Sequence, residues 1–138
     1  MPNDASALLV ISEDTIDKAR DWIEHAIAEQ ELEGFSIWPV IRKDTGTLIG
    51  RCGLHRTENG DIEVAWVLAR DQCGQGFATE AARAAIDYGL RVMKLNQLCA
   101  LILPLNSASV AVANRCEMRF DRVVRAYKRD MLKYTIGH

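Results

Sequence analysis

A glycine-containing loop between a strand pattern and a helix pattern is the feature that most constrains this fold. Residues 62–69 (IEVAWVLA) have the apolar and β-branched content of a strand, and Gly74 and Gly76 follow. An alanine-rich segment then repeats its apolar residues at helical spacing to about Lys94. The next run, 98–103 (LCALIL), is wholly apolar, which is typical of a strand covered on both faces. This order predicts a mixed α/β domain.

The same patterns predict further elements on both sides of this unit. They are a helix over about 13–31, strands over 35–43 and 47–56 joined by a tight turn at 44–46, a short helix over 107–116, and strands over 120–127 and 131–136. Because strands joined by tight turns run antiparallel, we expect an α/β (α+β) fold with a mostly antiparallel sheet. With 138 residues, 49% of them hydrophobic, and no linker or repeat, we expect a single domain over residues 1–138.

Composition argues against several classes of protein. No stretch approaches the roughly 20 apolar residues that cross a bilayer, and no basic-then-apolar leader is recognisable, so neither a membrane partner nor secretion is expected. The four cysteines form no Cys-x-x-Cys pair and the three histidines are scattered, which favours a cytoplasmic protein without a metal site. An isoelectric point near 5.9 argues against a nucleic-acid partner.

Charge is unevenly distributed along the chain. Residues 1–34 hold nine acidic and two basic residues, whereas residues 115–133 hold seven basic and three acidic ones. The acidic segment is suited to attract a cationic substrate and the basic segment an anionic ligand. Two solvated faces that offset one another would produce the same pattern.

The glycine loop has the form of an anion-binding site, because glycines let the backbone approach a ligand and a helix N-terminus carries partial positive charge. A nucleotide P-loop requires a lysine after the last glycine, and none follows Gly76. A dinucleotide fingerprint requires a third glycine, where Thr79 stands, and an acid about 20 residues further on. No acid occurs between Asp87 and Glu117. Both readings therefore fail.

Two segments carry the most specific motifs of the sequence, residues 71–90 (DQCGQGFATEAARAAIDYGL) and 106–114 (NSASVAVAN). Together they resemble the acetyl-CoA signature of the GNAT acetyltransferases, most closely the RimJ/RimL-like branch of ribosomal-protein N-terminal acetyltransferases. The resemblance extends over residues 34–136. It implies a GNAT fold, in which a mixed sheet is splayed between its central strands and has helices on both faces. The first strand and helix of that fold are expected to be missing or shortened here, with at most a short strand at 7–11.

The same resemblance implies how acetyl-CoA binds. The backbone of Trp66, Val67 and Leu68 pairs with the pantetheine amides, and Asn106 reaches the pantetheine. The pyrophosphate binds N–H groups of the loop and the helix start, formed by Gln72, Cys73, Gly74, Gln75, Gly76, Phe77, Ala78 and Thr79. Two residues depart from the family pattern: Asp71 is an acid beside a polyanion, and Cys73 stands where this branch usually has an aromatic residue.

Amide formation also requires proton transfer, because an alkyl ammonium with a pKa of about 10 must lose a proton before it attacks a thioester. Glu63 shares a face of its predicted strand with Ala65 and Val67, so it is the first candidate base. His55 is the second, because its unperturbed pKa suits the task. Many relatives protonate the leaving thiolate with a tyrosine, where this sequence has Ala113, so the resemblance makes Ser109 the candidate acid.

The expected function is transfer of an acetyl group from acetyl-CoA to a primary amine, either a protein N-terminus or a small molecule, by direct attack on the thioester. Because direct attack forms no covalent enzyme intermediate, Cys73 and Cys99 are not expected to act as nucleophiles. Cys99 also lies in a predicted buried strand, where a thiol is usually inert. The alternative is an acyl-CoA-binding module or pseudoenzyme without turnover, which Asp71, Ala113 and the short N-terminus favour. Homodimerisation through a sheet edge stays open.

Overall fold

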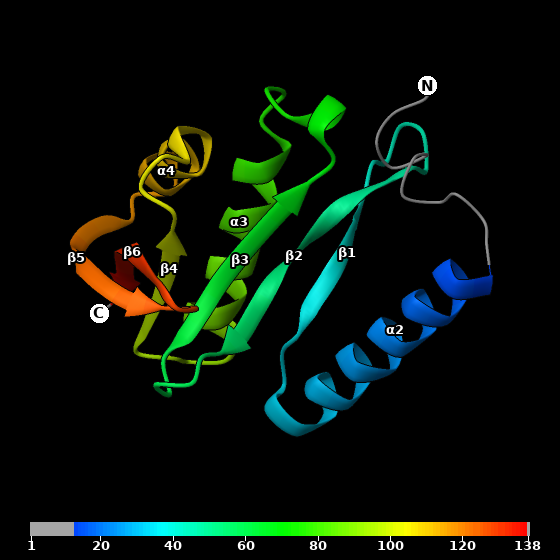
Figure 1. Ribbon diagram of the computed structural model, residues 1–138, viewed down its shortest axis with the longest axis horizontal. Coiled ribbons are helices and arrows are strands. Elements are labelled where there is room, and N and C mark those ends of the chain that lie inside the picture. Colours follow the sequence, from blue (N-terminus) through cyan, green and yellow to red (C-terminus); the bar gives the residue numbers. More distant parts are fainter. Residues whose placement is uncertain (1–12, 138) are drawn as a thin grey trace.

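Six strands form one sheet with helices on its two faces (Figure 1). The computed structural model describes residues 13–137. In chain order the elements are α2 (Glu13–Glu33), β1 (Ile37–Ile41), β2 (Leu48–Arg56), β3 (Ile62–Leu68), the 3-10 turn η1 (Arg70–Gln72), α3 (Phe77–Asp87), the π-helical turn η2 (Tyr88–Val92), β4 (Gln97–Ile102), α4 (Ser107–Arg115), β5 (Arg119–Ala126) and β6 (Arg129–Gly137).

The strand order is β1-β2-β3-β4-β6-β5, and the sheet consists of two antiparallel halves. Strands β1, β2 and β3 form a meander, and β4, β6 and β5 form the second half. The halves are joined where β3 runs parallel to β4. The prediction of a mixed, mostly antiparallel sheet is therefore confirmed, and the parallel junction is the feature that positions the site.

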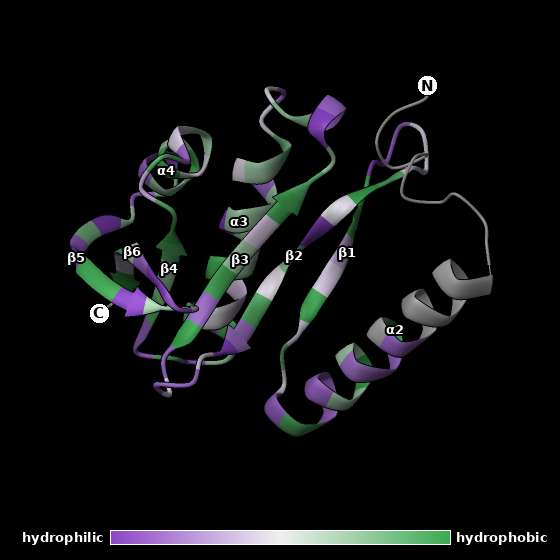
Figure 2. Cartoon of the chain, in the orientation of Figure 1, coloured by the Kyte–Doolittle hydropathy of each residue, from purple (hydrophilic) through white to green (hydrophobic). Residues whose placement is uncertain are grey.

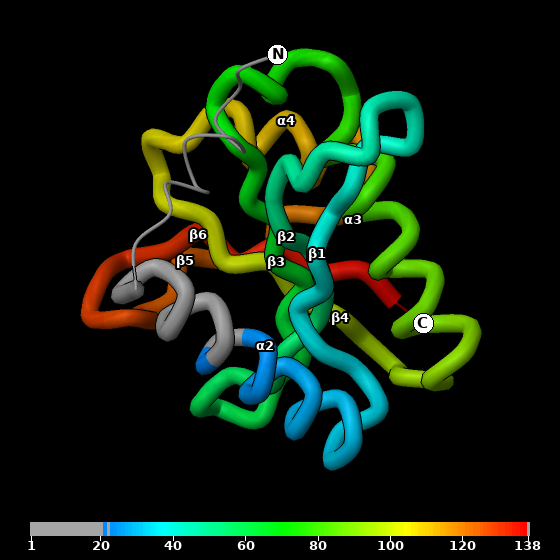
Figure 3. Tube along the Cα trace, turned by 90° about the vertical axis from the view of Figure 1, so that its right-hand side faces the viewer, coloured from blue at the N-terminus to red at the C-terminus, as the bar shows by residue number. Residues whose placement is uncertain are grey.

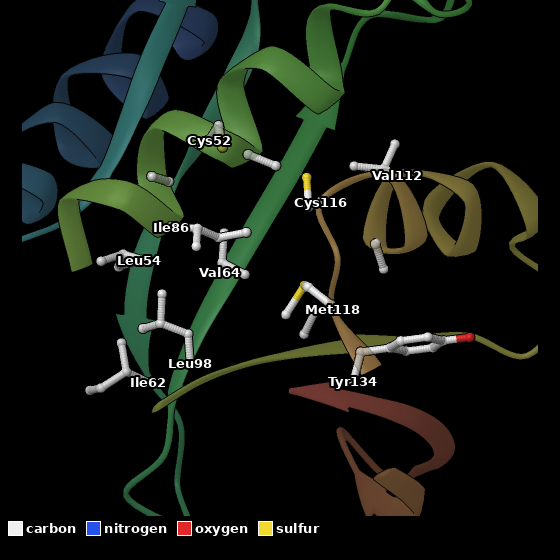
Figure 4. Packing of buried hydrophobic residues seen from close by; sticks show 14 of the residues in the cluster. Cys52, Leu54, Ile62, Val64, Ile86, Leu98, Val112, Cys116, Met118 and Tyr134 are labelled. Atoms are coloured by element: carbon white, nitrogen blue, oxygen red, sulfur yellow. The ribbon is translucent and has the colours of Figure 1, made fainter. Parts of the chain in front are cut away.

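The core lies between the sheet and α3, whose alanines bring the helix close to the strands. Ala82 is fully buried and packs in one cluster with Leu54 of β2, Val64 of β3 and Leu98 of β4 (Figure 4). The apolar run predicted at 98–103 is the central strand β4, which Figure 2 colours as hydrophobic. Burying a large aliphatic side chain contributes about 1.5–3 kcal/mol, so this face of the sheet is the main source of stability.

Helix α2 lies on the opposite face of the sheet from α3 (Figure 3). Near its C-terminal end, Glu29, Gln30 and Glu33 accept hydrogen bonds from side chains of the strands and of the segment before β1. Its Ile23 and Ile27 are 48% and 54% exposed. Gln30 accepts a hydrogen bond of 2.9 Å from the indole N–H of Trp38. The predicted helix thus exists, but these two members of its apolar stripe are not buried against the sheet.

Three sequence expectations differ from the structure or fall outside it. The helix predicted to about Lys94 ends at Asp87 and continues as η2, where Gly89 fits against the side chains of Leu54 and Leu98. The strand predicted over 120–127 ends one residue earlier, because Tyr127 lies in the turn between β5 and β6. The short strand expected at 7–11 lies outside the described residues.

Candidate functional site

Strands β3 and β4 separate just beyond the point where they meet. Glu63 is the only residue of β3 in register with β4 within the described sheet, and its partner is Cys99. Toward their C-terminal ends the two strands diverge, with α4 beyond β4 (Figure 1). This is the splay that the resemblance implied, and it leaves one edge of β3 without a strand partner.

A cavity of about 1020 Å³ lies between the end of β3, the glycine loop, the start of α3 and α4. Many residues that the sequence assigned to the cofactor or to catalysis line this cavity, namely Trp66, Val67, Leu68, Cys73, Gly74, Gly76, Ala78, Thr79, Asn106 and Ser109. Segments far apart in the sequence are thus brought to one cavity. Its size is at the upper end of typical ligand sites.

The backbone of the glycine loop has the conformation of an anion-binding cradle. Gly74 and Gly76 both have φ +84°, and a Cβ at either position would meet nothing within 4 Å. Glycine is therefore required by the backbone angle and not by lack of space. The first hydrogen bond of α3 runs from the Glu80 N–H to the Gly76 carbonyl at 3.0 Å. The N–H groups of residues 77–79 have no acceptor within the helix and are suited to bind an anion.

Two N–H groups that were predicted to join this cradle are already used within the loop. The Gln72 N–H donates to the Ala69 carbonyl at 2.9 Å, and the Cys73 N–H donates to the Arg70 carbonyl at 3.2 Å. These bonds close the turn η1, because a chain leaving a strand must reverse before it can start α3. The cradle consequently begins at Gly74.

Gln72, Gln75 and Phe77 were also predicted to bind the cofactor, but their side chains do not line the cavity. The Gln72 side chain is buried and accepts a hydrogen bond of 3.2 Å from the Arg42 guanidinium. That guanidinium also lies 4.9 Å from the centre of the Phe77 ring. Gln72 and Phe77 therefore brace the loop against the β1–β2 turn.

Helix α4 presents Asn106 and Ser109 to the cavity. The Asn106 Oδ1 accepts a hydrogen bond of 3.1 Å from the Ser109 N–H, which caps the helix. The half-buried Ser109 hydroxyl has no hydrogen-bond partner among the described residues. It is thus available to donate to a bound ligand. Ala113, at the position of the family tyrosine, is fully buried and does not line the cavity.

Glu63 is 5% exposed and its carboxylate binds three groups at the splay point. Its Oε1 accepts a hydrogen bond of 2.7 Å from the Tyr127 hydroxyl and lies 2.8 Å from His55 Nε2. Its Oε2 accepts a hydrogen bond of 3.0 Å from the Leu101 N–H of β4. The side chain thereby satisfies a backbone donor of β4, and it has both a structural and a chemical role.

The two candidate bases from the sequence are therefore in direct contact. The Glu63 carboxylate raises the pKa of His55 above its usual value of 6.5, more than burial lowers it. Burial and the same carboxylate raise the pKa of Tyr127, which keeps its hydroxyl protonated as a donor. His55 is the half-buried member of the pair, so it is the one that a substrate can reach.

Tyr127 is a member of this network that the sequence did not predict. It lies in the β5–β6 turn with φ +53°, followed by Lys128 with φ +62°. Hairpin turns with two positive φ values normally use Gly, Asn or Asp, so a Tyr-Lys pair gives no sequence signal for a turn. A bulky residue in this conformation is strained, and the hydrogen bond to Glu63 offsets part of that cost.

A second cavity, of about 370 Å³, lies between α2 and the face of β2 and β3 that carries His55. Its lining includes Glu29 of α2, Arg51 and His55 of β2, and Ala65 of β3. Val67 lines this cavity and the larger one. The two cavities therefore meet at Val67 of β3, which is in register with Arg51 and four residues along the strand from Glu63.

Two arginines of the larger cavity were not among the predicted site residues. Arg83 of α3 and Arg115 of α4 line it, and the Arg83 guanidinium donates a hydrogen bond of 2.8 Å to the Arg115 carbonyl. Arg115 begins the basic segment for which an anionic ligand was expected. The only signal for Arg83 was its place two turns after Gly76 on the predicted helix.

Thiol chemistry is disfavoured at the splay point. Burial raises the pKa of Cys99 to about 12, so its thiolate is scarce at neutral pH.

No group of three or more His, Cys, Asp or Glu residues with metal-ligand geometry occurs within residues 13–137. None of the helices in the described part of the chain has the length and apolar character needed to cross a membrane.

Comparison with known proteins defines the class. A family model described as acetyltransferase (GNAT) domain matches residues 5–119. The chain belongs to the GNAT acetyltransferase family and is a transferase by class.

Two bacterial relatives are similar in sequence. The uncharacterized protein YkkB of Bacillus subtilis is 32% identical over 120 residues, which are 85% of this chain and 70% of YkkB. The uncharacterized N-acetyltransferase p20 of Bacillus licheniformis is 34% identical over 117 residues, which are 83% of this chain and 65% of p20. The chain thus spans about two thirds of the length of these relatives.

Solved structures agree with the fold. An acetyltransferase from Agrobacterium tumefaciens matches with a TM-score of 0.77 and 25% identity, over 88% of this chain and 72% of that one. The microcin C7 self-immunity acetyltransferase MccE, solved with acetyl-CoA and AMP, matches with a TM-score of 0.74 and 17% identity, over 89% of this chain and 72% of that one. The predicted GNAT fold is confirmed.

Proposed function

We propose that this chain, as one acyl-CoA-dependent domain, transfers an acetyl group from acetyl-CoA to a primary amine by direct attack on the thioester. The observation that carries the proposal is the meeting of two cavities at Val67, one with an anion cradle and one with a histidine–carboxylate pair. Cofactor and acceptor enter such a site from opposite faces of the sheet.

The larger cavity suits acetyl-CoA. The pyrophosphate binds the N–H groups from Gly74 to Thr79, and Arg83 and Arg115 add positive charge near the phosphates. The pantetheine amides pair with the free edge of β3 at Trp66–Leu68. This arrangement brings the thioester toward Ala65, at the boundary of the acceptor cavity. The choice of ligand is supported by MccE, a protein of similar fold that was solved with acetyl-CoA.

The acceptor cavity supplies the base. The ammonium of the acceptor loses a proton to neutral His55, and Glu63 stabilises the imidazolium that forms. The amine nitrogen then attacks the thioester carbonyl, the amide C–N bond forms and the C–S bond breaks. The thiolate of CoA takes a proton from the Ser109 hydroxyl or from water, and the second proton that the nitrogen loses on becoming an amide restores this donor. His55 releases the first proton to solvent. Glu63 acts through His55, because its own oxygens already accept three hydrogen bonds.

The proposal extends to the branch of the family, the cellular compartment and the oligomeric state. The RimJ/RimL-like branch is supported by motif resemblance, together with fold similarity to ribosomal-protein acetyltransferases at 15–18% identity. The free Cys52, Cys73, Cys99 and Cys116 favour a reducing compartment such as the cytoplasm. The exposed edge strand β5 is a candidate surface for a homodimer.

Acetyl-CoA titration followed by a thiol-release assay over a panel of amines tests the proposal. We expect acetyl-CoA to raise the melting temperature and at least one amine to release free thiol. Binding without thiol release on any amine would favour the acyl-CoA-binding module that the sequence left as the alternative. Absence of binding would overturn both.

A further inference from the structure

Arg51 lines the acceptor cavity from the middle of β2. In the sheet it is in register with Val67 of β3 on one side and Pro39 of β1 on the other. Its side chain is exposed, on the same face of β2 as His55. A permanent positive charge thus lies at the place where the acceptor and cofactor cavities meet.

Arg51 lines the acceptor cavity without an ion pair to any acidic side chain that the structure describes. Five other arginines each form an ion pair with an Asp or a Glu, namely Arg42, Arg56, Arg91, Arg122 and Arg125. Arg51 forms neither an ion pair nor a hydrogen bond with any side chain that the structure describes. A guanidinium that lines a cavity without an internal acid is suited to bind an anion supplied by a ligand.

The phosphates of the cofactor are not the best partner for this guanidinium. The cavity that holds the glycine loop is lined by Arg83 and Arg115 but not by Arg51. Arg51 instead lines the smaller cavity with His55 and Ala65. The anion it would bind therefore belongs to the acceptor.

The acceptor cavity has opposite charges at its two ends. His55 is four residues from Arg51 along β2, or about 13 Å at the rise of an extended strand. Next to His55 are the buried carboxylate of Glu63 and the side chain of Glu29, so this end of the cavity attracts a cation. Ala65, toward which the thioester points, is in register with Gly53, midway between Arg51 and His55. A molecule with an ammonium near His55 and an anion near Arg51 matches this arrangement.

We propose that the amine acceptor is a small molecule that also carries a carboxylate, such as an α-amino acid or a short peptide with a free C-terminus, and that Arg51 binds that carboxylate. This inference rests on the proposed acetyl transfer. The cavity of about 370 Å³ is near the lower limit of ligand sites, which suits a small acceptor. The carboxylate takes no part in bond making and serves to orient the amine toward the thioester.

Matched acceptor pairs test the inference. Alanine, leucine, methionine and phenylalanine are each assayed as the free acid and as the carboxamide, with thiol release from acetyl-CoA as the readout. The amide has the less basic amine, so at neutral pH more of it is in the neutral form that attacks the thioester, and a preference for the acid cannot come from a larger supply of neutral amine. We expect kcat/KM for the free acids of preferred side chains to exceed that for their amides by about 10-fold or more, the size of one charge-assisted contact.

Arg51→Gln should raise KM for the free acids and so abolish most of their preference over the amides. Arg51→Lys should restore part of that preference. Arg91→Gln is the matched control, because it removes the same charge from an exposed i,i+4 ion pair on η2. Circular dichroism and acetyl-CoA affinity should be the same in all three variants. A preference that persists in Arg51→Gln would overturn the inference.

The experiment distinguishes failure of this inference from failure of the proposed function, because the two give different results. Thiol release that is equal or faster with the amides overturns the carboxylate contact and leaves acetyl transfer intact. If acetyl-CoA neither binds nor releases thiol, the proposed function fails. Calorimetric titration of the same acid and amide pairs into the protein with CoA present measures their affinities. It tests the contact between Arg51 and the carboxylate independently of turnover. Equal affinity for acid and amide, or no binding of either, then overturns it.

Discussion

The cofactor side and the acceptor side of β3 are built in different ways. On the cofactor side, the cradle consists of backbone N–H groups whose direction is set by two glycines and a helix start. On the acceptor side, the reactive groups are the side chains of His55, Glu63 and Tyr127, which come from three separate strands or turns. One side depends on local backbone conformation, and the other on contacts that only the assembled sheet creates.

The consequence is a difference in what substitutions should change. A change on the cofactor side should alter acetyl-CoA binding and leave proton transfer intact. A change on the acceptor side should alter turnover and its pH dependence, with little effect on acetyl-CoA affinity. The predictions that follow test this separation, from the largest expected effect to the smallest.

Glu63→Gln should have the largest effect. It removes the charge that stabilises the His55 imidazolium, so kcat should fall by about 10²–10⁴-fold, the range for loss of acid–base catalysis. Acetyl-CoA affinity, measured by calorimetry, should stay within a factor of about three, and circular dichroism should report an intact fold. A 10-fold loss of acetyl-CoA affinity with an unchanged kcat would contradict the separation of the two sides.

The same variant should shift the pH profile. Because His55 must be neutral to accept a proton, kcat/KM of the wild type should rise with pH through the raised pKa of His55, above 6.5, and then level off. In Glu63→Gln the main cause of that shift is lost while burial still lowers the pKa. The rising limb should therefore move to lower pH. A limb at the same pH in both proteins would show that His55 is not the titrating base.

Ser109→Ala should have the second largest effect. The hydroxyl has no partner among the described residues and lines the cofactor cavity, so its removal costs no internal hydrogen bond. We expect kcat to fall by about 10²-fold, the lower part of the range for general acid catalysis. The melting temperature should stay within about 2 °C of the wild type, since the Asn106 cap accepts from a backbone N–H that alanine retains. Unchanged kcat would remove Ser109 as the acid.

Gly76→Ala should weaken acetyl-CoA binding by a smaller factor. A Cβ at this position meets no atom within 4 Å, but φ is +84°, where an alanine costs about 1–2 kcal/mol. Gly46→Ala is the matched control, because Gly46 has φ +72° and open space as well but lies in the β1–β2 turn. Both variants should lose similar stability in denaturant unfolding. Only Gly76→Ala should weaken acetyl-CoA binding, by about 10-fold.

The sequence predicted the cofactor side better than the acceptor side for the same physical reason. A strand, two glycines and a helix lie within one short segment, so the pattern of residues 62–87 reports the cradle directly. The sequence does not show that the N–H groups of Gln72 and Cys73 close a 3-10 turn, because no residue propensity reports this. The contact between His55 and Glu63 depends on the register of β2 with β3, which periodicity alone does not specify.

Tyr127→Phe should have the smallest effect and tests the acceptor side most narrowly. It removes one hydrogen bond to Glu63 and keeps the ring, so Glu63 should interact more strongly with His55 and the rising limb of kcat/KM should move to higher pH. We expect kcat to fall by less than about 10-fold and unfolding free energy to fall by about 1 kcal/mol, the value of one hydrogen bond. Phe120→Leu, on the same hairpin and packed against Tyr134, is the control for general loosening of β5. If both variants lower kcat equally and neither moves the pH limb, the hydroxyl of Tyr127 has no role beyond holding the hairpin.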